Sequence, residues 1–132
     1  MPQRLLVHTS HQAVRWGDMD ALGHVNNTLY FRYLEQARLE WVYTLVDGYA
    51  AGQGPVIANA ICNFRRPLVY PANLEIHMYL GAPGTTSVTS YYDIVAAGET
   101  FADGESRIVW IDLATGRPCP LPAAIVEPLR AL

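Results

Sequence analysis

The sequence has 132 residues, 51% of them hydrophobic, and its 12 acidic side chains outnumber its 9 basic ones to give a formal net charge of −3. A chain of this length can bury a sizeable core, so we expect a single domain over residues 1–132. The longest basic run is Arg65-Arg66, which argues against nucleic acid as the main partner. The sequence shows neither an apolar leader at its start nor a stretch long enough to span a membrane, so we expect a cytoplasmic protein.

The residues that usually bind metals are scattered. Cys62 and Cys119 lie far apart and match no metal or redox motif, which is typical of free thiols in a cytosolic protein. His8, His11 and His77 also lack the spacing of a metal site. We therefore expect no metal and no cofactor.

The first expected element is a strand, because residues 5–16 alternate loosely between apolar and polar side chains. A turn over residues 18–27 follows. From about residue 27 to residue 47 the apolar positions repeat with the period of a helix, which Gly48 ends. We expect this helix to be buried on more than one side. Its predicted apolar positions are Tyr30, Phe31, Leu34, Ala37, Trp41, Val42, Leu45 and Val46.

Strand patterns dominate the rest of the chain, after a loop over residues 50–55. The predicted strands cover residues 56–65, 73–81, 85–96 and 100–112. Short connections between them imply antiparallel neighbours, although the connection at 65–71 is irregular because it contains two prolines. The tail over 122–131 is expected to add one or two helical turns. One apolar helix and one antiparallel sheet make an α+β architecture in which a curved sheet wraps the helix.

The turn before the helix holds the candidate chemistry. Asn26 and Asn27 are suited to cap the helix start, where unpaired N–H groups and the helix dipole attract developing negative charge. Asp20 stands seven residues before Asn27, so its carboxylate could attack a carbonyl group whose oxygen rests on the helix amides. We interpret the other acid of this turn, Asp18, as a structural residue that bonds the turn or Arg15.

Three motifs in this order resemble the hotdog-fold acyl-CoA thioesterases, most closely the 4-hydroxybenzoyl-CoA thioesterase family. They are Asp-x-x-x-His-x-Asn-Asn at 20–27, Tyr-Leu-Glu-Gln-Ala-Arg at 33–38 and Arg-Pro-Leu-Val-Tyr-Pro at 66–71. The resemblance implies a hotdog fold, in which a five-stranded antiparallel sheet wraps one long central helix. It also implies a homodimer or homotetramer whose active site, shared between subunits, hydrolyses acyl-CoA.

The resemblance also implies roles for single residues. Asp20 stands where the family keeps its catalytic carboxylate, and Asn27 stands where a backbone N–H points at the thioester carbonyl. His24 either bonds the turn backbone or helps to place water. Ala21-Leu22-Gly23 departs from the Pro-Ala-Gly of the 4-hydroxybenzoyl-CoA enzymes, and the residues after it are more similar to the branch that hydrolyses fatty acyl-CoA.

Five further residues are candidates for substrate binding. Arg65 and Arg66 can bind the phosphates of coenzyme A, but they can equally be solvated or paired with acids across a dimer. Tyr30 and Tyr33 line the acyl pocket or belong to the core. Asn26 caps the helix beside the expected position of the thioester.

The expected reaction is thioester hydrolysis, with Asp20 as nucleophile or as general base for water. A hotdog dehydratase is an alternative, but the catalytic His of that chemistry is absent from the helix at 27–47. A second alternative is a non-catalytic module that binds acyl-CoA or acyl-carrier protein, which would not need Asp20. A purely structural subunit would not need the acidic turn at all. Acyl preference stays open, because packing at a dimer interface sets the depth of the pocket.

Overall fold

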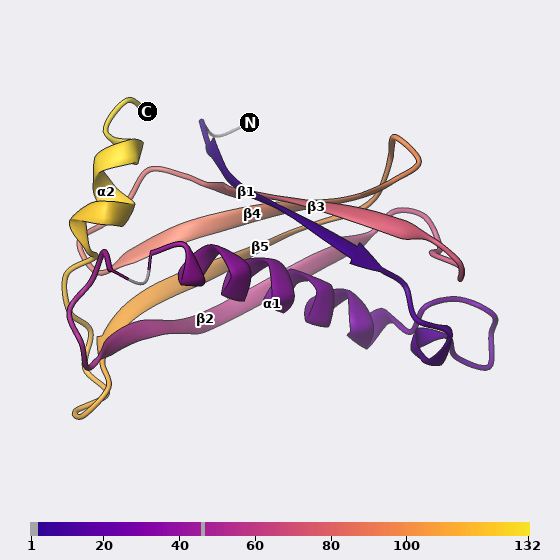
Figure 1. Ribbon diagram of the computed structural model, residues 1–132, viewed down its shortest axis with the longest axis horizontal. Helices are drawn as coiled ribbons and strands as arrows, with labels where there is room; N and C mark the ends of the chain where they lie inside the picture. Colours follow the sequence, from indigo (N-terminus) through magenta and orange to yellow (C-terminus); the bar gives the residue numbers. More distant parts are fainter. Residues whose placement is uncertain (1–2, 46) are drawn as a thin grey trace.

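The computed structural model describes residues 3–45 and 47–132. Its elements in chain order are β1 (Leu5–Ala13), the short 3-10 helix η1 (Trp16–Asp18), α1 (Asn27–Tyr43), β2 (Gln53–Phe64), β3 (Asn73–Leu80), β4 (Ser87–Ala96), β5 (Glu99–Asp112) and α2 (Ala123–Leu129). The five strands form one antiparallel sheet in the order β1-β3-β4-β5-β2, and α1 lies across one face of it (Figure 1). The predicted α+β hotdog fold is confirmed.

The core lies between α1 and the inner face of the sheet. β3 and β4 alternate between buried residues and residues that are half-buried or exposed, as expected of a sheet that is covered on one face. Their inward apolar side chains are Leu74, Ile76, Met78, Leu80, Val88, Tyr92, Ile94 and Ala96. Each large side chain buried here contributes about 1.5–3 kcal/mol relative to its exposed state.

Gly104 on β5 has no side chain, and this lets α1 and β2 pack closely against the strand. A Cβ on Gly104 would lie 2.7 Å from the carbonyl oxygen of Ile61 and 3.2 Å from Leu34 Cδ1. The first distance is shorter than van der Waals contact allows, so any side chain at this position would displace β2. Gly104 therefore helps to fix the spacing between the helix and this edge of the sheet.

The helix α1 ends earlier and is buried over a narrower face than the sequence predicts. It ends at Tyr43, because Thr44 turns back onto the Trp41 carbonyl through both its backbone N–H and its hydroxyl. Phe31, expected on the buried face, is 37% exposed, since the sheet covers only one side of the helix. Val46 lies outside the described residues.

Two strand boundaries also differ from the prediction. β1 ends at Ala13, not near Gly17, because the following residues form η1. β2 begins at Gln53, inside the expected loop, and contains Pro55. A proline is tolerated there because β2 is an edge strand, whose outward N–H groups need no partner in the sheet.

The connection between β2 and β3 is not a hairpin, so the expectation that these two strands are neighbours is wrong. β2 pairs with β5, whereas β3 lies between β1 and β4. The connection runs past the start of α1, where the Leu68 carbonyl accepts a hydrogen bond from Val25 N–H at 2.8 Å and Leu68 N–H donates to Tyr30 Oη at 3.2 Å. These contacts tie the crossing to the candidate site.

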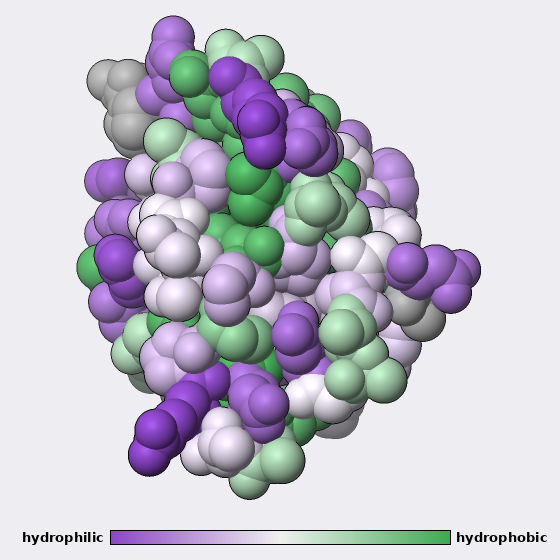
Figure 2. Space-filling model, turned by 90° about the vertical axis from the view of Figure 1, so that its left-hand side faces the viewer, coloured by the Kyte–Doolittle hydropathy of each residue, from purple (hydrophilic) through white to green (hydrophobic). Residues whose placement is uncertain are grey.

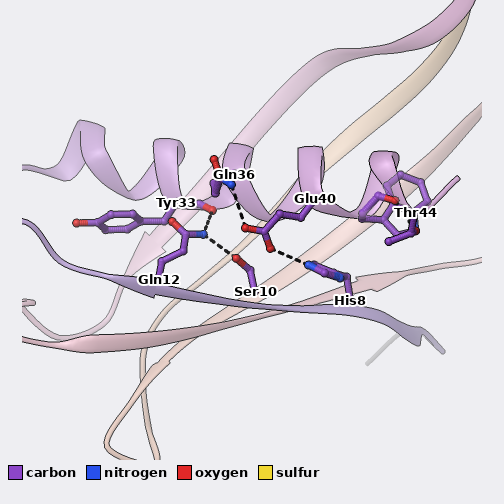
Figure 3. A network of polar contacts seen from close by, with 8 residues as sticks. His8, Ser10, Gln12, Tyr33, Gln36, Glu40 and Thr44 are labelled. Atoms are coloured by element: carbon purple, nitrogen blue, oxygen red, sulfur yellow. Dashed lines mark hydrogen bonds and ion pairs between the residues drawn. The ribbon is translucent and has the colours of Figure 1, made fainter. Parts of the chain in front are cut away.

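Polar side chains join α1 to the edge strand β1 (Figure 3). Glu40 on α1 lies 2.8 Å from His8 Nε2 and accepts a hydrogen bond from Gln36 Nε2 at 3.0 Å. Gln12 donates to the Tyr33 carbonyl at 2.8 Å. Burial raises the pKa of Glu40, but the hydrogen bonds to its carboxylate outweigh burial and hold that pKa below its ordinary value.

The short helix α2 closes one end of the core with Ile125 and Leu129, which are both buried. Seen from the left-hand side of Figure 1, hydrophobic side chains lie in the middle of the surface with polar ones around them (Figure 2). No helix in the part of the chain that the structure describes is long and apolar enough to cross a membrane.

Candidate active site

The turn between β1 and α1 folds into a hydrogen-bonded loop. Asp20 N–H donates to the His24 carbonyl at 2.8 Å, and Asn26 N–H donates to the Asp18 carbonyl at 3.0 Å. The chain reverses at Gly23, whose φ of 83° lies in the left-handed region that favours glycine. The loop thus brings Asp20 back toward the start of α1.

Asp18 anchors this loop from inside the protein. Its Oδ2 accepts hydrogen bonds from Arg15 N–H at 3.0 Å and from the Tyr33 hydroxyl at 2.8 Å, and the side chain is buried. Burial, with the hydrogen bond to Asp18, raises the pKa of Tyr33. These bonds agree with the prediction that Asp18 is a structural residue. The Tyr33 hydroxyl is therefore engaged by a buried carboxylate.

Asp20 is half-buried at the outer end of the loop. Its Oδ1 accepts a hydrogen bond from Leu22 N–H at 2.9 Å, while its Oδ2 has no hydrogen-bond partner among residues 3–45 and 47–132. The residue lines a cavity of about 500 Å³ together with Trp16, Met19 and Tyr70. A carboxylate oxygen is therefore free beside a hollow large enough for a small ligand.

The first residue of α1 offers an unpaired donor. Asn26 caps the helix, since its Oδ1 accepts a hydrogen bond from Thr28 N–H at 2.9 Å. The N–H of Asn27 has no acceptor within the described residues. Asn27 and the exposed His24 line a second cavity, of about 240 Å³. The other residues around this cavity are Val25, Tyr30, Phe64, Arg65, Arg66 and Pro67.

Asp20 and Asn27 border two different cavities of the single chain, on either side of the turn. The two residues lie near the ends of a loop that is closed by the Asp20–His24 and Asn26–Asp18 backbone hydrogen bonds. One short segment thus presents a free carboxylate oxygen and a free N–H group, the two kinds of group that acyl transfer uses.

The two arginines expected at the coenzyme A phosphates are exposed and paired with acids of β5. Arg65 Nε lies 2.8 Å from Asp103 Oδ2, and Arg66 forms an ion pair with Glu99. The hydrogen bond from Arg65 holds the pKa of Asp103 below its ordinary value. Exposed ion pairs of this kind contribute little, so either arginine can exchange its carboxylate for a phosphate at small cost.

The two candidate tyrosines of α1 have different surroundings. Tyr30 is buried and forms an edge-on contact with Phe64, with ring centroids 4.9 Å apart, at the cavity next to Asn27. Burial raises the pKa of its hydroxyl. Tyr33 does not line that cavity; it borders a separate one between α1 and β1. The structure thus brings Asn27, His24, Tyr30, Arg65 and Arg66 together around one cavity. Tyr33 does not line that cavity, although its ring centroid lies 6.3 Å from that of Tyr30.

Sequence reasoning did not single out the aromatic residues around Asp20. Trp16 stands four residues before Asp20, and Tyr70 lies in the motif at 66–71, but only the fold places them around one cavity. No cluster of three or more His, Cys, Asp or Glu able to hold a metal is present among the described residues. Cys62 and Cys119 are free, and burial raises the pKa of Cys62 to about 11.

The class of protein follows from the fold together with the comparison of its sequence with known families. The family model of the thioesterase-like superfamily matches residues 14–129, so the chain belongs to that superfamily. Both the resemblance to hotdog thioesterases and the predicted class of enzyme, a thioester hydrolase, are thereby confirmed.

Three relatives illustrate the similarity. The PA2801 protein of Pseudomonas aeruginosa, a proposed thioesterase, is 40% identical with a TM-score of 0.87 over 94% of this chain and 98% of its own. A proposed acyl-CoA thioesterase from Xanthomonas campestris is 36% identical, with a TM-score of 0.72 over 82% of this chain and 95% of its own. A proposed esterase of Aquifex aeolicus is 27% identical over 121 residues, 89% of this chain and 93% of the relative.

Proposed function

We propose that this protein hydrolyses the thioester of acyl-coenzyme A to a free acid and coenzyme A. The observation that carries the proposal is that one short loop carries both a carboxylate oxygen of Asp20 and an N–H group of Asn27 that have no hydrogen-bond partner among the described residues. Membership of the thioesterase-like superfamily supports the same reaction. No metal or redox cofactor takes part in the proposed chemistry; coenzyme A enters only as part of the substrate.

The helix start is the proposed oxyanion site. The substrate carbonyl oxygen accepts a hydrogen bond from Asn27 N–H, where the dipole of the 17-residue helix α1 favours negative charge. The charge on this oxygen grows as the carbonyl carbon is attacked. One such donor typically lowers the barrier by about 3 kcal/mol.

Asp20 supplies the other half of the proposed reaction in one of two ways. As a nucleophile it attacks the carbonyl carbon, the C–S bond breaks, and water then hydrolyses the resulting mixed anhydride. As a general base it removes a proton from a water molecule that attacks the same carbon directly. In both routes the leaving thiolate takes up a proton. His24, exposed at the cavity of Asn27, is proposed to help place the water.

The remaining candidates are proposed to hold the substrate. Tyr30 lines the cavity next to the oxyanion site, and Asn26 holds the helix start in place through its cap. Arg65 and Arg66 stand at the rim of the same cavity and are proposed to exchange their carboxylate partners for the phosphates of coenzyme A.

A second copy of the chain is the proposed partner, in a homodimer or homotetramer. β2 is an edge strand of the sheet (Figure 1). Its middle residues, on both faces of the sheet, are exposed. The exposed apolar side chains on this strand are Val56, Ile57, Ile61 and Phe64. An uncovered apolar edge invites pairing with another strand, and two β2 edges can satisfy each other. The cytoplasmic location stays a prediction from the sequence.

The test is release of free thiol from acetyl-, octanoyl- and benzoyl-CoA by the wild-type protein and the Asp20→Asn variant. We expect the variant to remain folded and to lose about 100-fold or more in turnover. Asp18→Asn is the comparison. Loss of activity in Asp18→Asn with none in Asp20→Asn would show that the wrong carboxylate was chosen. Binding without thiol release by the wild type would instead indicate a non-catalytic binding module.

A further inference from the structure

The cavity at Asp20 is lined mostly, but not entirely, by apolar surface. It holds about 500 Å³, and besides Asp20 its lining residues are Trp16, Gly17, Met19, Ala21 and Tyr70. We call this cavity the Trp16 cleft. Its walls come from the loop that carries the proposed catalytic carboxylate and from the crossing between β2 and β3.

Trp16 is exposed in a way that the rest of the protein does not explain. Its side chain is 77% exposed, whereas Trp41 and Trp110 are 3% and 0% exposed. An indole ring left in water forgoes a large burial energy, so an exposed tryptophan is informative. The ring belongs to η1, which the buried Asp18 ties to α1 through Tyr33, so the backbone that carries the ring is held against the helix.

The opposite wall is also tied to the catalytic loop. Tyr70 is 43% exposed, and its backbone N–H lies 3.3 Å from Met19 Sδ. Two aromatic rings and a thioether therefore surround a space that opens on the Asp20 carboxylate. Surfaces of this kind bind flat or flexible apolar groups.

We propose that the Trp16 cleft binds the acyl group of the substrate and selects apolar acyl groups larger than acetyl. This inference rests on the proposed function, because it takes the thioester to lie at Asp20. Only parts of the substrate a few bonds from the thioester can then enter a cavity that Asp20 itself lines. The adenine and phosphates of coenzyme A are excluded, because the whole pantetheine arm separates them from the thioester.

The pantetheine arm is the other neighbour of the thioester, and the cleft suits it poorly. Its amide groups need hydrogen-bond partners when they leave water, and the side chains of the cleft offer them only the Trp16 indole N–H, the Tyr70 hydroxyl and the Asp20 carboxylate, which the reaction itself uses. The cavity next to Asn27, with Arg65 and Arg66 at its rim, provides polar and cationic groups instead. The acyl group is the part that matches the Trp16 cleft.

The first experiment compares Trp16→Ala with Leu22→Ala. Leu22 is 80% exposed in the same loop but does not line the cleft, and its backbone contact with Asp20 survives the change. We expect Trp16→Ala to lower kcat/KM at least tenfold for octanoyl- and benzoyl-CoA but within about twofold for acetyl-CoA. Leu22→Ala should change none of the three, and Trp16→Phe should recover most of the loss.

The second experiment needs no turnover. Because Trp16 is the exposed tryptophan and the other two are buried, quenching of fluorescence by a bound ligand reports on the cleft. In Asp20→Asn, benzoyl-CoA should quench this signal and free coenzyme A should not. Equal quenching by benzoyl-CoA and free coenzyme A would overturn the inference. It would also be overturned if Trp16→Ala lowered kcat/KM equally for all three substrates, or if this variant had an altered oligomeric state. If the wild type releases no thiol, the proposed function fails, while the quenching still decides whether the cleft binds acyl groups.

Discussion

The Tyr33 hydroxyl lies 2.8 Å from Oδ2 of the buried Asp18, and this bond joins the second turn of α1 to the loop that carries Asp20. The same aspartate accepts the Arg15 N–H through its side chain and the Asn26 N–H through its carbonyl. Three segments therefore meet at one residue. The separation between the Asp20 carboxylate, which we propose to be catalytic, and the helix start depends on this junction.

We expect Tyr33→Phe to lower the free energy of unfolding by about 1–2 kcal/mol, because it leaves a buried carboxylate oxygen with one donor fewer. Turnover should fall with the loosened loop, whereas KM should change little, since the hydroxyl does not border the cavity next to Asn27. Urea unfolding and steady-state kinetics measure the two effects. Tyr43→Phe, at an exposed tyrosine on the same helix, is the control. A raised KM at unchanged stability would instead place the Tyr33 hydroxyl on the substrate.

The β2 edge predicts an assembly larger than one chain. Light scattering at micromolar concentration should give a mass of at least twice the 14.6 kDa of the chain. Ile61→Lys places a charge on the exposed edge strand, so it should favour the monomer and lower thioesterase activity. Leu113→Lys changes an equally apolar, exposed residue outside β2 and should do neither. A fully active wild-type monomer would rule out both the dimer and a shared active site.

The contact between His8 and Glu40 predicts a stability that depends on pH. The folded pKa of Glu40 lies below its ordinary value, so its stabilising contribution is present above the ordinary glutamate pKa of about 4.3 and is lost as the pH falls toward the folded pKa. Melting temperatures from pH 3 to pH 7 should show this loss in the wild type. We expect a flatter acid profile and a lower melting temperature at pH 7 for Glu40→Gln.

The control for this prediction is Glu35→Gln, which removes an exposed carboxylate that forms an ion pair with Arg32 on the same helix. Its acid profile should match that of the wild type. Some acid dependence should also remain in Glu40→Gln, because Asp103 has a lowered pKa of its own. Identical acid profiles for Glu40→Gln and the wild type would show that the contact with β1 does not contribute to stability.

Local patterns predicted most of the fold, because helical periodicity and strand alternation are properties of neighbouring residues. The crossing between β2 and β3 could not be predicted in this way. It depends on contacts of Leu68 with Val25 and Tyr30, which lie about forty residues earlier in the chain. The early end of α1 depends on how Thr44 folds back onto Trp41, a detail of side-chain geometry that periodicity does not contain.

The candidate site likewise has one part that sequence spacing predicts and another that depends on contacts between distant segments. The acid, the cap and the helix start lie within one short turn, so their proximity could be predicted from spacing alone. The Trp16 cleft could not, because Tyr70 reaches Met19 only through the crossing. The pairing of Arg65 with Asp103 likewise depends on the register between β2 and β5, which long-range packing sets.

The final prediction concerns the helix start, where the backbone of Asn27 should matter more than its side chain. Asn27→Pro removes the proposed oxyanion donor at the first helical position, which tolerates proline. The preceding Asn26 has φ −60° and ψ 135°, an extended conformation that a following proline permits. We expect turnover to fall about 100-fold or more while the melting temperature changes little, because the donor acts mainly on the transition state.

Asn27→Ser is the matched control, since it keeps the N–H and should retain most of the turnover and stability. Circular dichroism should show the same helix content in both variants, so that a difference in rate reflects the missing donor. If Asn27→Pro kept turnover near that of the wild type, the carbonyl would have to be polarised by another group. His24, at the same cavity, would then be the first residue to substitute, followed by groups that a partner subunit brings to the β2 edge.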